Sequence, residues 1–95
     1  MMNGTEVEIF NKYLEIKQDL IGNLRDVWNR RNTYIRKYRG NEKTNINVAV
    51  TNTEEGNKLL QIFVGYEKLW IKDVLIFNSQ GLVSSKITTN LGEDV

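Results

Sequence analysis

The sequence predicts an α+β protein in which a long N-terminal amphipathic helix packs on a small antiparallel β-sheet. Three observations support this: apolar residues recur at spacings of three and four through the first forty residues, strand-like segments alternate in the second half, and a glycine turn joins the last two of these segments. A chain of 95 residues, 40% hydrophobic and 26% charged, has the composition of one globular domain. We expect a single domain over residues 1–95, with the helix at 5–39 and the sheet-containing half at 44–95.

The predicted helix has a start signal and a stop signal. Thr5 and Glu8 have the spacing of a capping box, and Gly40 follows Arg39 where a helix end accepts a left-handed residue. An apolar seam runs between them and is interrupted by Lys17 and Arg31; its members are Val7, Phe10, Leu14, Ile21, Leu24, Trp28, Ile35 and Tyr38. A second apolar stripe lies beside this seam and consists of Tyr13, Leu20, Val27 and Tyr34.

The length of this helix suggests a homodimer. About 35 residues span roughly 50 Å, whereas a compact domain of this size is only about 30 Å across. Two arrangements remain open: a kink near Gly22 and Asn23, or a straight helix whose overhang pairs with a second chain. We favour the second, with a dimer interface formed by Phe10, Leu14, Ile21, Leu24, Trp28 and Ile35.

The second half of the chain contains three predicted strands and one ambiguous segment. Asn45–Thr51, Trp70–Phe77 and Leu82–Thr88 alternate as strands do, and the turn Asn78–Gly81 joins the last two. Lys58–Glu67 fits both a helical spacing and a strand alternation, and we slightly favour a helix there.

The composition excludes several kinds of chemistry. The chain has no Cys and no His, so Cys- or His-ligated zinc sites, iron–sulfur clusters, disulfides and a Ser-His-Asp triad are all excluded. Ser84 and Ser85 have no nearby base in the sequence, and we expect the adjacent Glu54 and Glu55 to lie in a solvated turn. We therefore predict no catalytic residue, no metal site, no cofactor and no enzymatic activity.

Positive charge is concentrated in one segment. The formal net charge is +1, yet residues 25–43 contain seven bases and two acids. A solvated helix face is the favoured interpretation; a contact with a protein, a membrane surface or nucleic acid is the alternative. The candidate contact residues are Arg25, Arg30, Arg36, Lys37 and Arg39. No apolar run approaches the roughly 18 residues of a membrane-spanning helix.

The C-terminal strand–turn–strand resembles a known family. Val74–Ser85, followed by Asn90–Val95, is similar to the corresponding part of Cache domains, which are PAS-like extracytoplasmic sensor modules. The resemblance implies a fragment of a larger sensor domain that dimerises through its long helix and senses a small-molecule ligand. It assigns no ligand-binding residue to this chain.

Two functions therefore remain open. The favoured one is a non-catalytic ligand-sensing and signal-transduction module of Cache type, whose occupancy shifts helix packing. The alternative is a small interaction protein, such as a phage or plasmid-type inhibitor, that binds a protein or nucleic acid through its basic helix face. The first implies an extracytoplasmic location, the second a cytoplasmic one, and the sequence does not decide between them.

Overall fold

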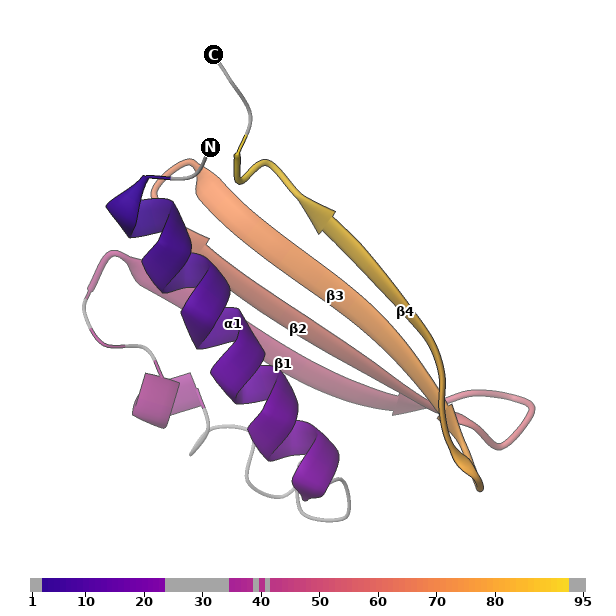
Figure 1. Ribbon diagram of the computed structural model, residues 1–95. Helices are drawn as coiled ribbons and strands as arrows, with labels where there is room; N and C mark the ends of the chain where they lie inside the picture. Colours follow the sequence, from indigo (N-terminus) through magenta and orange to yellow (C-terminus); the bar gives the residue numbers. More distant parts are fainter. Residues whose placement is uncertain (1–2, 24–34, 39, 41, 93–95) are drawn as a thin grey trace.

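One helix lies across one face of a four-stranded antiparallel sheet (Figure 1). The computed structural model describes residues 3–23, 35–38, 40 and 42–92. The helix is α1 (Gly4–Gly22), and the strands, which pair in chain order, are β1 (Thr44–Asn52), β2 (Lys58–Tyr66), β3 (Leu69–Asn78) and β4 (Gly81–Thr89). The predicted α+β class, with a helix on a small antiparallel sheet, is confirmed.

The helix begins slightly earlier than predicted because a different residue caps it. The Asn3 side chain accepts a hydrogen bond from the Glu6 N–H at 2.9 Å, and the Glu6 carboxylate accepts one from the Asn3 N–H at 3.2 Å. This is a capping box displaced by two residues from the predicted pair, Thr5 and Glu8.

The predicted continuous helix over residues 5–39 is wrong. α1 ends at Gly22, and the Asn23 side chain donates a hydrogen bond to the Asp19 carbonyl at 2.9 Å. Residues 35–38 are again helical, but the Tyr38 hydroxyl lies 2.7 Å from the Asp19 carboxylate. Nineteen residues of one helix would separate these positions by about 28 Å, so they do not belong to a single helix. Gly22 and Asn23 are weak helix formers, which accounts for the stop.

The ambiguous segment is a strand, so the slight preference for a helix was wrong. β2 lies between β1 and β3, where both of its edges are hydrogen-bonded. Its buried residues Leu60, Ile62 and Val64 alternate along one face, with Gln61 and Phe63 on the other. A strand satisfies every backbone group of this segment within the sheet, which an isolated turn of helix could not do.

The hydrophobic core lies between α1 and the inner face of the sheet, the face toward the helix. α1 lies against β2 and β3. It contributes four buried residues, Ile9, Tyr13, Ile16 and Leu20. The sheet contributes Ile46, Val48, Leu60, Ile62, Val64, Ile71, Leu75 and Phe77. Tyr13 and Leu20 belong to the second stripe of the sequence analysis, so that stripe, and not the seam, faces the sheet.

The residues after β4 are tied to the first turn of α1. The Gly92 N–H donates a hydrogen bond to the Glu6 carboxylate at 2.6 Å, and Gly92 has a φ of +80°, which glycine adopts without strain. The hydrogen bond from Gly92, and then the one from Asn3, hold the pKa of Glu6 below its ordinary value of 4.5. The Glu6 carboxylate therefore both caps α1 and anchors the end of the described chain.

We predict that Glu6→Gln makes stability depend less on pH. A carboxyl group whose pKa is lowered by folding stabilises the native state above its unfolded pKa, and this contribution disappears as the pH falls through the native value. The variant should melt below the wild type at neutral pH, and the difference should shrink below pH 4.5. Thermal unfolding followed by circular dichroism measures it, with Glu8→Gln, an exposed change in the same turn, as control. A difference that is constant with pH would contradict the prediction.

Candidate functional site

Exposed apolar side chains lie on β4 and on one flank of α1. Among the described residues, the large hydrophobic side chains that are exposed all lie on these two elements: Val7, Ile21, Leu82, Val83 and Ile87 are 39–58% exposed. The flank is identified by Lys17, whose ammonium lies 3.3 Å from the Ser85 hydroxyl on β4. Phe10, Leu14 and Ile21 are seven, three and four residues from Lys17, which are helical spacings, and they lie on the same flank. We call this region the α1–β4 surface; it consists of Val7, Phe10, Leu14, Ile21, Leu82, Val83 and Ile87.

A buried carboxylate lies beneath this surface. Asp73 of β3 is completely buried, and its Oδ2 accepts a hydrogen bond from the Tyr13 hydroxyl at 2.5 Å. The Lys17 ammonium forms an ion pair with the same oxygen at 3.0 Å. Oδ1 accepts a hydrogen bond from the Ser85 hydroxyl at 2.8 Å. The charge therefore has three donors from two other elements, as a buried ion requires.

Ordinary helix and strand geometry brings these four residues together. Tyr13 and Lys17 are one helical turn apart and therefore share one side of α1. Asp73 occupies an inward position of β3 between Ile71 and Leu75. Ser85 pairs with Leu75 across the β3–β4 ladder, which places its side chain on the same inner face as Asp73.

The chemistry of this cluster is that of a satisfied structural network. Burial, followed by the hydrogen bond to Asp73 and its negative charge, raises the pKa of Tyr13 far above its ordinary value, so the phenol stays protonated. The Ser85 hydroxyl donates to Asp73 and accepts from Lys17, whose ammonium is itself paired with a carboxylate.

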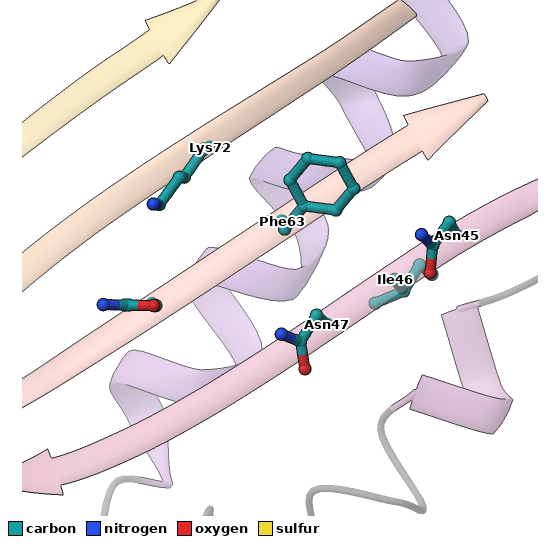
Figure 2. Close-up of a pocket in the computed structure, with 6 residues that line it drawn as sticks. Asn45, Ile46, Asn47, Phe63 and Lys72 are labelled. Atoms are coloured by element: carbon teal, nitrogen blue, oxygen red, sulfur yellow. The ribbon is translucent and has the colours of Figure 1, made fainter. Parts of the chain in front are cut away.

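The opposite face of the sheet presents a different surface. We call it the outer face. Asn45 and Asn47 of β1, Phe63 of β2 and Lys72 of β3 project from this side, with α1 behind the sheet (Figure 2). Together with Gln61 they line an open hollow of about 500 Å³.

The predicted dimer-interface residues lie in different environments in the structure. Ile21 is exposed, and Phe10 and Leu14 are partly buried at the edge of the core. Ile35 packs against the core cluster and is therefore partly sheltered within its own chain. Leu24 and Trp28 lie outside the described residues.

The structure describes two of the five residues of the predicted basic face. Arg36 and Lys37 are exposed, and Lys37 forms an ion pair with Asp19 at 3.3 Å. Arg25, Arg30 and Arg39 lie outside the described residues, so a contact through this face stays a prediction.

Sequence reasoning missed the Asp73 cluster. In the sequence Lys17 is only an interruption of the apolar seam, and its carboxylate partner lies 56 residues away on β3. An acid at an inward position of an alternating strand was the available signal. Such a residue needs a buried donor, and a lysine within an apolar helix face can supply one.

Comparisons with known proteins assign no family to the chain. A scan against protein-family models and searches of curated proteins and of solved structures gave no match.

Within the described part of the chain, no cluster of acidic residues has the arrangement needed to hold a metal ion. None of the described helices combines the length and hydrophobicity needed to cross a membrane.

We predict that Asp73→Asn lowers the free energy of unfolding by about 3 kcal/mol, because it leaves the partly buried Lys17 ammonium without its counter-charge. Ser85→Ala is the matched control, since it removes one donor from the same carboxylate, and we expect it to cost about 1 kcal/mol. Urea unfolding of both variants measures these losses. Equal losses in the two variants would show that the charge of Asp73 has no special part in stability.

Proposed function

We propose that this protein is a non-catalytic interaction module that works as a homodimer through the α1–β4 surface. The observation that carries the proposal is the grouping of exposed hydrophobic side chains on two adjacent elements. Scattered apolar residues are ordinary on a protein surface, whereas a contiguous group is typical of an interaction site. The half-buried Phe10 and Leu14 extend the group toward the core.

The free edge of β4 supports a second copy of this chain as the partner. β4 is the last strand of the four-stranded sheet, so the backbone groups on its outer edge have no strand partner in that sheet. Two antiparallel copies of one strand are self-complementary about a two-fold axis. Pairing of this kind would continue the sheet from one protomer into the other.

The sequence of β4 favours one register for this pairing. With the two-fold axis at Ser85, Val83 lies opposite Ile87 of the second copy, and Lys86 lies opposite Ser84 of the second copy. This register pairs exposed apolar residues with each other and separates the two Lys86 side chains. Shifting the axis to Lys86 would place like charges directly opposite, which destabilises a sheet.

A signalling role of Cache type remains a proposal that rests on the order of helix and hairpin. It is supported by the hydrogen bond between Glu6 and Gly92, which connects the start of α1 to the chain leaving β4. A change in the position of α1 within a dimer would be transmitted directly to the residues that follow β4. The described hollows are open to solvent, so we place the interaction surface, and not an enclosed ligand cavity, at the centre of the function.

We predict that Val83→Lys dissociates the homodimer and raises its dissociation constant at least about tenfold, because it places a charge opposite Ile87 of the second copy. Val83 is 58% exposed, so the protomer itself should remain folded. Analytical ultracentrifugation over a concentration series gives the mass and the dissociation constant.

Thr51→Lys is the matched control, since it adds the same charge at an exposed position of β1, the opposite edge of the sheet. We expect it to leave the dissociation constant unchanged. A wild-type mass of one chain up to millimolar concentration, or equal effects of the two substitutions, would overturn the proposal.

A further inference from the structure

We infer that the outer face of the sheet binds single-stranded nucleic acid, with bases stacking on Phe63 and phosphates contacting Lys72 and Lys86. This goes beyond the proposed homodimer and uses the other side of the sheet. The juxtaposition that carries it is an aromatic ring on a central strand, on a face that no described element covers, with amide side chains on one side and Lys72 on the other (Figure 2).

The ring of Phe63 packs over a glycine of its own strand. Phe63 lies on β2, a central strand, and it is partly exposed, whereas Leu60, Ile62 and Val64 on the other face are buried. Its ring lies over Gly65: a Cβ atom at Gly65 would come within 3.0 Å of the Phe63 Cε1 atom. Gly65 pairs with Trp70 of β3, so two aromatic residues belong to the same end of the outer face. Aromatic rings on an open sheet offer stacking surfaces that any base can use.

The charges of the outer face have a single sign. Lys72 pairs across the sheet with Phe63, and Lys86 pairs with Val74 on the neighbouring position of β3. Strand alternation places both lysines on the outer face, where the four strands carry no carboxylate. The acids nearest to the sheet lie in the turns, at Glu54, Glu55 and Glu67. An anionic ligand therefore finds attraction along β3 and β4 and meets no like charge on the outer face of any of the four strands.

The remaining side chains supply hydrogen bonds that suit bases. Asn45, Asn47 and Gln61 line the hollow beside Phe63, and each amide offers both a donor and an acceptor. Base edges present the same combination once a strand is unpaired. A duplex hides the Watson–Crick edges and the faces of its bases, so we assign the surface to single strands.

Fluorescence anisotropy with labelled single-stranded DNA and RNA of about 12 nucleotides tests the inference. With two phosphate contacts, the logarithm of the binding constant should fall with the logarithm of salt concentration with a slope of about −1.4. Lys72→Gln should reduce that slope to about −0.7. Phe63→Leu should weaken binding about tenfold and leave the slope unchanged, because it removes stacking and no charge.

Lys58→Gln is the matched control. Lys58 lies on β2 but on the other side of the sheet, where its ammonium lies 3.3 Å from the Asn52 side chain, so its loss lowers the net charge without touching the outer face. We expect its binding to equal that of the wild type. Circular dichroism confirms that each variant is folded, and Lys72→Gln, at an exposed position, provides a test even if Phe63→Leu proves unstable.

Four outcomes would overturn the inference: no binding of either single strand at about 50 mM salt, tighter binding of a duplex, equal effects of Lys58→Gln and Lys72→Gln, or unchanged affinity in Phe63→Leu. Stronger binding of RNA than of DNA would support it and add a contact to the 2′-hydroxyl. The inference is separate from the homodimer, because Val83→Lys should still bind the oligonucleotide as a single chain.

Discussion

The buried carboxylate of Asp73 is the constraint on which the arrangement of helix and sheet depends. A fully buried charge needs hydrogen-bond donors or a counter-charge. Here they are supplied by Tyr13 and Lys17 on α1 and by Ser85 on β4. These contacts fix the rotation of α1 about its own axis, because Tyr13 must face β3 while Lys17 faces β4. They also hold β4, which α1 does not cover, to the rest of the core.

This constraint explains which part of the helix the sequence could and could not predict. Spacings of three and four correctly indicated an amphipathic helix, and two neighbouring apolar stripes were recognised. Periodicity alone does not say which of two adjacent stripes is buried. The stripe containing Tyr13 and Leu20 faces the sheet because Tyr13 donates to Asp73, and the seam containing Phe10, Leu14 and Ile21 therefore lies on the flank. The deciding contact joins residues that are 60 positions apart, which local patterns do not encode.

The two errors of secondary structure have similar physical origins. The apolar spacing continues past Gly22, but helix propensity falls there and the Asn23 side chain ends the helix. Lys58–Glu67 carries apolar residues that fit either period, and its place between two other strands decided the outcome. The hairpin of β3 and β4 was predictable because its alternation and its glycine turn are local features, and Gly81 indeed has a positive φ of 128°.

The uncovered surfaces follow from the number of elements. An α-helix is about 10 Å wide and strands are about 4.8 Å apart, so one helix covers about two strands of a four-stranded sheet. α1 occupies the space above β2 and β3, and Ile35 and Tyr38 add to the core beside it. Tyr38 contacts Asp19, on the flank of α1 opposite to Lys17, so this addition leaves the side of β4 open. None of the described elements lies over β4, and its free edge and exposed apolar residues support the proposal that a second protomer covers it.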